Sequence, residues 1–385
     1  MLVDDRVGAV GGIDTALRIL SAGFKGAGYN VEFFSFFKAP ENPSFEIARK
    51  VPYIFREQVY NLQYSHKILW TSSAKLKKIV KKAWRLYADL RMLLYILPRR
   101  KGHIFVFTNF ASAEAAVSSI KLIRRLGGDS LFIHQMHMAF DSEYIQSLLP
   151  SVEKRLLDVF DEILMLTRQD AESASKYFGQ EIGFIENPIL QSENVQSIVA
   201  EKRGATISCI TRFTYQKRLE LAISAFDAIA HDFPQWTLNI YGEGADRDKL
   251  ATLIESSKNK HQILLNGPVD SKTAMQIWEK TDLNLMSSRF EGLPMTILEA
   301  ASCATPTVAT PCSPGLNQFV EGAGFLADND TQVALEEALK QAMTSPELRE
   351  AKARQGLSKI AENSVEKIVE KWEKIFHTIS VERNR

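Results

Sequence analysis

The residues of this chain best placed to do chemistry are two glutamates on either side of a Gly-Leu-Pro turn. Glu291 and Glu299 stand eight positions apart. The apolar run at 283–286 predicts a short buried strand, and the segment from Pro294 onward predicts a helix with proline in its first turn. The loop would place Glu291 at the carboxyl end of the strand, and Glu299, within the helix, would point back toward the same end of the strand. This arrangement suits a sugar hydroxyl at one carboxylate and a ribose at the other.

The start of the same helix offers a second kind of group. The backbone next to Pro294 carries Leu293, Met295 and Thr296, whose N–H groups are expected to lack partners within the helix. The positive end of a helix dipole favours a phosphate or a polarised oxygen. We therefore expect these amides to face a ligand.

Two cations precede the glutamates in the chain. Arg212 lies just past a predicted strand, and Lys217 follows five residues on, at the start of the next predicted helix. An arginine grips phosphate oxygens in a bidentate manner and a lysine acts as a point charge. Such a pair can neutralise a departing diphosphate without a metal ion.

Two glycine-rich segments are candidates for close approach of a ligand. Gly242 and Gly244 follow a predicted strand, but the dinucleotide fingerprint Gly-x-Gly-x-x-Gly fails because Arg247 stands at its last position. A tight turn beside a ligand is the simpler interpretation. Near the beginning, Gly11 and Gly12 lead into a helix and would cradle a diphosphate from the opposite side.

A histidine also stands at the carboxyl end of a predicted strand. His134 occupies a position where open α/β sheets place functional groups, although a structural role is the alternative. His137 is predicted either to contact an acceptor or to hold the loop.

Together these segments resemble the retaining glycosyltransferases of family 4, in group 1, whose GT-B fold has two facing Rossmann-like domains. The resemblance is carried by the segment 287–300, and by Thr211-Arg212-Phe213 with Lys217, which is similar to the family's Gly-Arg-Leu segment followed by lysine. Here Thr211 replaces the glycine and Phe213 the leucine.

The resemblance implies roles for individual residues. Glu291 would orient the sugar hydroxyls, Glu299 would bind the ribose, and His134 would face the donor sugar. Main-chain groups near Val269 would face the base, and Gly12 and Leu293 would complete the donor site. The donor is a substrate, expected to be UDP-linked, and no cofactor is expected. Same-face attack without a covalent intermediate is implied.

Apolar runs alternate with helix-period segments almost throughout, which predicts doubly wound α/β domains. Predicted strands lie at 31–36, 104–108, 131–134, 162–166, 183–185, 206–210, 237–241, 263–265, 283–286 and 307–309. Predicted helices lie near 13–24, 111–126, 144–160, 169–178, 217–230, 247–257, 272–280 and 294–302. The start leaves room only for a very short first strand, unless the native start lies upstream of Met1.

The predicted domain boundary lies between 187 and 188, because a polar stretch follows Pro188. The resemblance implies that the first domain, 1–187, binds the acceptor and that the second, 188–363, binds the nucleotide-sugar. An apolar stripe within 364–385 predicts a last helix, and the resemblance implies that it crosses back to the first domain.

Composition fits a two-domain enzyme, with 385 residues of which 45% are hydrophobic. No apolar run approaches the roughly 18 to 20 residues of a transmembrane helix, and no secretory signal is evident, so a cytoplasmic location is expected. The three cysteines lack Cys-x-x-Cys spacing. The Asp-x-Asp patterns at 246–248 and 328–330 are predicted to cap helices instead of binding metal.

A basic stretch at 66–101 holds eleven Lys or Arg against one acidic residue, although the whole chain carries only +1. This local charge does not indicate a nucleic-acid partner. Residues at helical spacing form an apolar stripe: Leu76, Ile79, Val80, Ala83, Tyr87, Leu90 and Leu94. Three interpretations stay open: a solvated face on a docked helix, a helix lying peripherally on anionic lipid, and a track for a phosphate-rich polymer.

The acceptor is expected to be a cell-envelope glycan, a polymer or a lipid-linked molecule. Two alternatives to a hexosyltransferase remain at this point. One is a nucleotide-sugar epimerase of similar fold, which needs no acceptor. The other is a non-catalytic partner subunit or membrane adaptor built on the same fold.

Overall fold

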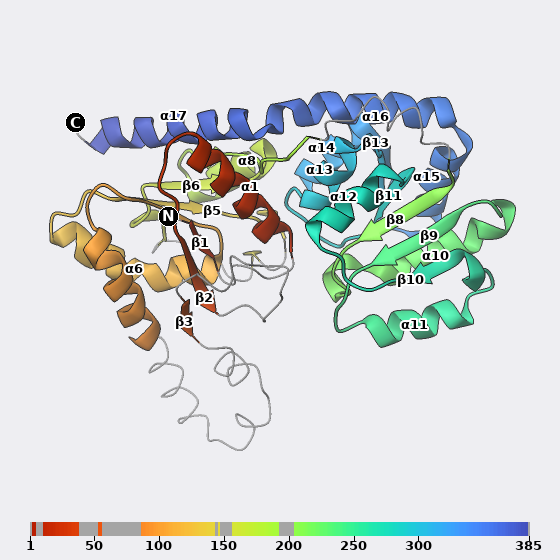
Figure 1. Cartoon of the computed structure of the whole chain (residues 1–385), viewed down its shortest axis with the longest axis horizontal. Helices are drawn as coiled ribbons and strands as arrows, with labels where there is room; N and C mark the ends of the chain where they lie inside the picture. Colours follow the sequence, from red (N-terminus) through yellow and green to blue (C-terminus); the bar gives the residue numbers. More distant parts are fainter. Residues whose placement is uncertain are drawn as a thin grey trace, which may run out of the picture.

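The computed structural model describes residues 2–4, 11–37, 53–55, 86–142, 145–146, 156–191 and 204–383. These residues form two parallel β-sheets, each with helices on its faces, that lie side by side along the long axis of the molecule (Figure 1). The predicted α/β architecture is confirmed.

The first sheet has seven strands in the order β3-β2-β1-β4-β5-β6-β7. Its strands are β1 (Leu2–Asp4), β2 (Phe33–Phe37), β3 (Tyr53–Phe55), β4 (Ile104–Phe107), β5 (Leu131–Gln135), β6 (Glu162–Met165) and β7 (Gly183–Phe184). The first strand is short, as the sequence predicts. The central strands β4 and β5 are almost wholly buried, which explains their continuous apolar runs.

The second sheet has six strands in the order β10-β9-β8-β11-β12-β13. Its strands are β8 (Thr206–Ile210), β9 (Thr237–Tyr241), β10 (Ile263–Leu265), β11 (Leu283–Met286), β12 (Thr307–Ala309) and β13 (Gly324–Leu326). In each sheet the chain first adds strands on one side of the starting strand, β1 or β8, and then adds the remaining strands on its other side. Such a switch point leaves a crevice at the carboxyl ends of the strands.

Helices cover both sheets. The first domain has α1 (Gly12–Gly26), α6 (Phe110–Arg125), α8 (Arg168–Phe178) and an unlabelled helix at 86–96. The second has α10 (Leu219–Ile229), α11 (Arg247–Ser256), α12 (Ser271–Glu279), α13 (Met295–Ser302), α14 (Pro314–Ala323), α15 (Gln332–Thr344) and α16 (Pro346–Ile360). No helix in these described ranges is both long and apolar enough to span a membrane.

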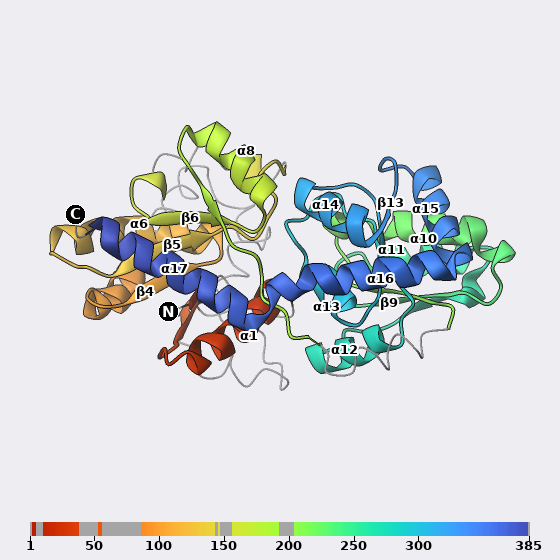
Figure 2. The same ribbon diagram turned by 90° about the horizontal axis from the view of Figure 1, so that it is seen from above.

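The last helix, α17 (Val365–Arg383), follows α16 and runs over the first domain (Figure 2). Its apolar stripe joins the core beneath the first sheet, where Trp372 is fully buried beside Phe24 and Phe376. The predicted crossing of the C-terminal helix is confirmed.

The two places where the chain passes between the domains are bonded to each other. Ile189 N donates to Asn363 O (2.9 Å), and Asn363 Nδ2 donates to Asn187 O (3.1 Å). The first sheet ends before this point and the second begins after it, so the predicted division at 187/188 falls between the sheets.

Some local expectations differ from the structure. Strands β3 and β13 were not predicted, and most of the helix predicted at 144–160 lies outside the described residues. Pro294 is the N-cap of α13 and not part of its first turn, because its ψ of 137° is extended. Asp246 occupies the N-cap position of α11 without a side-chain capping bond, and Thr331, not Asp330, caps α15.

Candidate active site

A buried ion pair lies at the carboxyl edge of the second sheet. Lys217 ends the short 3₁₀ turn Tyr215–Lys217 after β8, and its Nζ lies 2.5 Å from Oε1 of Glu291 in the loop after β11. The two side chains are only 13% and 7% exposed. A charged hydrogen bond shielded from water is stronger than one on the surface. The structure thus joins two residues that the sequence separates by 74 positions.

Ser287 fixes the backbone that carries this lysine. Its Oγ lies 3.1 Å from the carbonyl oxygen of Lys217 and 2.9 Å from that of Arg218. Arg218 itself takes a left-handed conformation, with φ of 50°. Ser287 was not singled out from the sequence, although it opens the Glu291 segment.

Arg212 is exposed to solvent and is linked to the glutamate loop through Gln216. Its Nη2 makes one long hydrogen bond, 3.4 Å, to Oε1 of Gln216. Gln216 in turn donates from Nε2 to the carbonyl of Phe290 (3.0 Å) and accepts from the N–H of Arg289 (2.8 Å). Gln216, which sequence reasoning missed, therefore holds the cation loop against the glutamate loop.

The glycine turn after β9 packs directly on the Arg212 loop. Gly242 and Gly244 have φ of 146° and 158°, and a Cβ on either would overlap the carbonyl oxygen of Thr211 or Phe213. The N–H of Phe213 donates to the carbonyl of Glu243 (2.8 Å). Glycine is required here because backbone meets backbone.

Glu299 lies inside α13 and is 8% exposed. Burial raises the pKa of its carboxyl group, while Trp278 and the Arg18 guanidinium act in the opposite direction. Arg18 belongs to α1 of the first domain. It reaches Ser271 Oγ of the second domain (2.5 Å) and pairs with Asp14 in its own helix (3.3 Å). Glu299 is therefore surrounded by groups from both domains.

Two close approaches bring the first domain against the glutamate loop and α13. A Cβ on Gly12 would lie 3.3 Å from Cγ of Met295, and one on Gly292 would lie 2.9 Å from the carbonyl oxygen of His137. Gly11 is the N-cap residue of α1. The part of the glycine loop before Gly11 lies outside the described residues. The structure thus brings Gly12 to the helix start predicted to bind a ligand.

His134 occupies a different environment from the one expected. It is fully buried in β5, donates from Nδ1 to the carbonyl of Phe107 (3.0 Å), and packs against the rings of Phe110 and Phe160. Burial lowers its pKa to about 4. Contact between His134 and a donor stays a prediction; the structure places His137, not His134, against Gly292.

His137 is held by Gln135, whose Oε1 accepts from Nε2 at 3.1 Å. Burial and the neighbouring His134 lower the pKa of His137 to about 3, so its ring is neutral near pH 7. Its Nδ1 has no hydrogen-bond partner within the part of the chain that the structure covers.

The remaining predicted residues lie around the same edge. Leu293 and Met295 are buried in the cluster that joins the two domains, and Thr296 is half-buried in the first turn of α13. Pro294 precedes that turn. Val269 is half-buried in the loop between β10 and α12.

The sequence of the second domain matches a known family. Residues 191–359 fit the family described as glycosyl transferases group 1. Over this domain the chain is therefore similar to the group 1 glycosyltransferases. An uncharacterized glycosyltransferase of Haemophilus influenzae is 22% identical over 383 residues, covering 96% of this chain and 97% of the relative. The amylovoran biosynthesis glycosyltransferase AmsD of Erwinia amylovora is 22% identical over 307 residues, covering 77% and 84%.

Solved structures support the fold assignment. A mutant of TarM from Staphylococcus aureus, in complex with fondaparinux, alpha-GlcNAc-glycerol and UDP, superposes with a TM-score of 0.71 at 15% identity, covering 98% of this chain and 99% of that one. The predicted GT-B fold of this glycosyltransferase is thereby confirmed.

Cys312 is a further residue of the glycosyltransferase that the sequence did not single out for the site. Its half-buried thiol has a pKa raised to about 12, chiefly by burial and also by the nearby Glu291 carboxylate. The thiol is therefore protonated at neutral pH and is a poor nucleophile.

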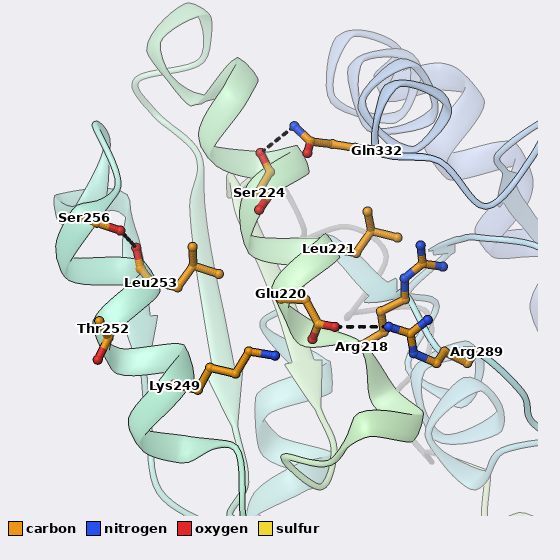
Figure 3. A pocket seen from close by; sticks show the side chains of 10 residues that line it. All are labelled: Arg218, Glu220, Leu221, Ser224, Lys249, Thr252, Leu253, Ser256, Arg289 and Gln332. Atoms are coloured by element: carbon orange, nitrogen blue, oxygen red, sulfur yellow. Dashed lines mark hydrogen bonds and ion pairs between the residues drawn. The ribbon is translucent and has the colours of Figure 1, made fainter.

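A separate open groove of about 600 Å³ lies on the glycosyltransferase between α10 and α11 (Figure 3). Arg289 and Glu220 pair at 3.4 Å on one side of the groove, and Lys249 points toward them from α11 on the other side. None of the site residues predicted from the sequence lines this groove. Within the described ranges no group of three or more His, Cys, Asp or Glu side chains is arranged to hold a metal ion.

Proposed function

We propose that this glycosyltransferase moves a hexosyl unit from a UDP-sugar to a cell-envelope glycan, polymer or lipid-linked acceptor, with retention of configuration and without a metal ion. The observation that carries the proposal is the buried Lys217–Glu291 pair at 2.5 Å, with exposed Arg212 linked to the Glu291 loop through Gln216. One carboxylate is thereby fixed for sugar hydroxyls, and two cations are available for a diphosphate.

Lys217 and Arg212 are suited to stabilise a departing diphosphate, which gains negative charge as the bond to the sugar breaks. An ammonium has three donors, so Lys217 can bind a phosphate oxygen while it still pairs with Glu291. Among the described residues, Arg212 makes a single long side-chain contact, 3.4 Å to Gln216, so its guanidinium can turn toward the second phosphate. The first amides of α13 add backbone donors at the same edge.

The proposed reaction breaks the bond between the anomeric carbon and the phosphate oxygen of the donor. The bonding electron pair stays on that oxygen, where Lys217 and Arg212 stabilise it. The acceptor oxygen bonds to the anomeric carbon on the same face, and its proton passes to the departing phosphate. Glu291 orients the sugar and forms no covalent bond.

The relatives support the substrate classes of the proposal. AmsD is named for the biosynthesis of amylovoran, and the TarM complex contains UDP together with alpha-GlcNAc-glycerol. These names fit a UDP-linked donor and an acceptor that is a polymer or part of one.

The nucleotide can be tested by measuring thermal unfolding with UDP-, GDP- and ADP-sugars. A ligand at a hundred times its Kd stabilises the folded state by about 2.7 kcal/mol. We expect UDP-sugars to raise Tm most. Arg212→Gln should weaken this shift without lowering the Tm of the free protein, because Arg212 is exposed. Stabilisation by GDP- or ADP-sugars alone would contradict the choice of nucleotide.

Catalysis is tested with Glu291→Gln, which is expected to lower kcat by about a hundredfold or more because the sugar loses its fixed orientation. Glu220→Gln is the matched control, since it removes another arginine- or lysine-paired carboxylate of the same domain. Nucleotide release should depend on added acceptor, which separates transfer from epimerisation. A sugar adduct trapped on Glu291 and detected by mass spectrometry would overturn same-face attack.

A further inference from the structure

Two basic features of this chain lie apart from the predicted site. The stretch at 66–85 lies outside the described residues. The second feature is the open groove of about 600 Å³ between α10 and α11 (Figure 3). Its volume falls within the range of about 300 to 1,000 Å³ that small-molecule sites occupy. The described residues that line it include three cations and one carboxylate, a net charge of +2: Arg218, Lys249, Arg289 and Glu220.

The two arginines of the groove are held in place by their neighbours. Nε of Arg289 donates to the carbonyl oxygen of Tyr215 (3.3 Å), its guanidinium stacks over the Tyr215 ring at 4.2 Å, and its Nη2 pairs with Glu220 (3.4 Å). Nη1 of Arg218 pairs with Asp330 at 3.1 Å. A guanidinium has five N–H donors, so both arginines keep donors for a ligand. Side chains that are fixed before binding lose less conformational entropy when a ligand arrives.

Lys249 brings a third cation to the groove from the opposite side. It is exposed, and among the described residues its ammonium makes no ion pair. Figure 3 shows it pointing from α11 toward Arg289 and Glu220. A cleft lined mainly by one sign of charge raises the local concentration of the opposite ion. An anion in this groove would therefore be bound from both sides.

Charge and lining indicate the class of ligand. A phosphate monoester carries about −1.5 to −2 at neutral pH, which matches the groove, whereas a carboxylate carries a single negative charge. Guanidinium groups also bind phosphate oxygens in a bidentate manner. Farther along the groove lie two apolar and three polar side chains: Leu221, Leu253, Ser224, Ser256 and Gln332 (Figure 3). This mixture suits a ligand body that has both carbon and hydroxyl groups.

We propose that the groove binds a phosphate monoester of a sugar or polyol, outside the donor site. Arg289 stands two positions before Glu291, and Arg218 directly follows Lys217. The N–H of Arg289 also donates to the carbonyl of Gln216 at 2.8 Å. A ligand in the groove would therefore contact both loops of the predicted donor site while leaving Lys217 and Glu291 to the donor. This binding does not depend on the identity of the donor.

The test is calorimetric titration of the full chain with glycerol 2-phosphate at low salt. We expect binding that weakens as salt rises, because salt screens the attraction. Glycerol should not bind. Glycerate, with its smaller charge, and inorganic phosphate, without the hydroxylated body, should both bind more weakly. Lys249→Gln should lower the affinity by about tenfold, which corresponds to the loss of one charged hydrogen bond, and Lys249→Arg should restore most of it.

Two further variants locate the bound phosphate. Lys340→Gln is the matched control and should not change the affinity, because Lys340 is an exposed lysine of the same domain that does not line the groove. Arg212→Gln should also leave the affinity for glycerol 2-phosphate unchanged, which separates the groove from the predicted diphosphate site whether or not a UDP-sugar is the donor.

Each of three results would overturn the proposed site: no binding of glycerol 2-phosphate, equal affinity in Lys249→Gln, or loss of affinity in Arg212→Gln. Inorganic phosphate or glycerate that binds as tightly as glycerol 2-phosphate would overturn the proposed class of ligand.

Discussion

Arg18 and Glu299 come from different domains, and the structure links them electrostatically. Arg18 is anchored between Asp14 (3.3 Å) and Ser271 (2.5 Å), and its charge lowers the pKa of Glu299, which burial raises. An ionised carboxylate accepts hydrogen bonds at both oxygens, which suits the two hydroxyls of a ribose, whereas protonation turns one oxygen into a donor. For the ribose-binding role predicted for Glu299, we infer that Arg18 is a positioning residue, because its charge favours the ionised carboxylate.

We expect Arg18→Gln to raise the pKa of Glu299 further. Each added unit of pKa multiplies the neutral-to-charged ratio by ten. Affinity for UDP should therefore fall most at low pH and recover as the pH rises above the new pKa. Calorimetric titration between about pH 5 and pH 9 measures this shift.

Three variants serve as controls for that titration. Arg18→Lys keeps the charge and should restore most of the profile. Ser271→Ala removes only the hydrogen bond and should leave the profile in place. Glu299→Gln should remove the pH dependence altogether. An equal loss of affinity at every pH in Arg18→Gln would show that Arg18 acts only on packing.

For individual residues, the sequence predicted which residues belong to the site better than it predicted which of them contact one another. Glu291, Lys217 and Arg212 could be selected because their loops follow predicted strands. Their pairing could not be predicted, because it depends on how two loops 74 positions apart are brought together. The histidines show the same limit. Strand β5 continues to Gln135, which leaves His134 inside the core and His137 beyond the strand end.

Among the elements, the glycine turn after β9 makes the most specific demand on residue type. Gly242→Ala would place a Cβ against the carbonyl oxygen of Thr211 in a backbone conformation with φ of 146°. Strain of this kind costs about 1–3 kcal/mol before the overlap is counted. We expect Tm to fall by several degrees, since about 1 kcal/mol corresponds to 2–4 °C in a domain of this size. UDP binding should weaken as well, because the Arg212 loop is displaced.

Gly267→Ala is the control in the next loop. Its added Cβ would meet nothing within 4 Å, so stability and UDP binding should be nearly unchanged. Differential scanning calorimetry and the UDP titration measure both properties. Equal effects of the two substitutions would mean that close packing on Thr211 is not what requires glycine.

Elements with a clear apolar run or a single apolar face were predicted well, and elements that lack one were not. Strands β8 to β12 have clear apolar runs between helices. Strand β13, Gly-Phe-Leu, begins with a glycine, a residue type depleted in strands, so the sequence did not single it out. The helix at 86–96 has apolar residues on both faces, so periodicity identified a helix but could not say which face is packed.

At the scale of the molecule, α17 completes the core of the first domain. Trp372→Ala should destabilise that domain by about 3–5 kcal/mol, because a fully buried tryptophan leaves a large cavity. Calorimetry should show a lower-temperature transition for the first domain while the second changes little. Thr378→Ala, at an exposed position of the same helix, should have an effect within about 0.5 kcal/mol. A single transition that shifts as a whole would instead show that the domains unfold together.

The position of α17 also affects how the protein is made. Synthesis runs from the first residue to the last, so the strands of the first sheet leave the ribosome before the helix that covers them. Leu17, Leu20 and Phe24 pack against α17 in the folded protein. During synthesis they therefore lack this covering helix until the whole second domain has been translated. A nascent chain stalled before residue 365 should therefore recruit chaperones or be sensitive to protease, even though its first sheet is already complete in sequence.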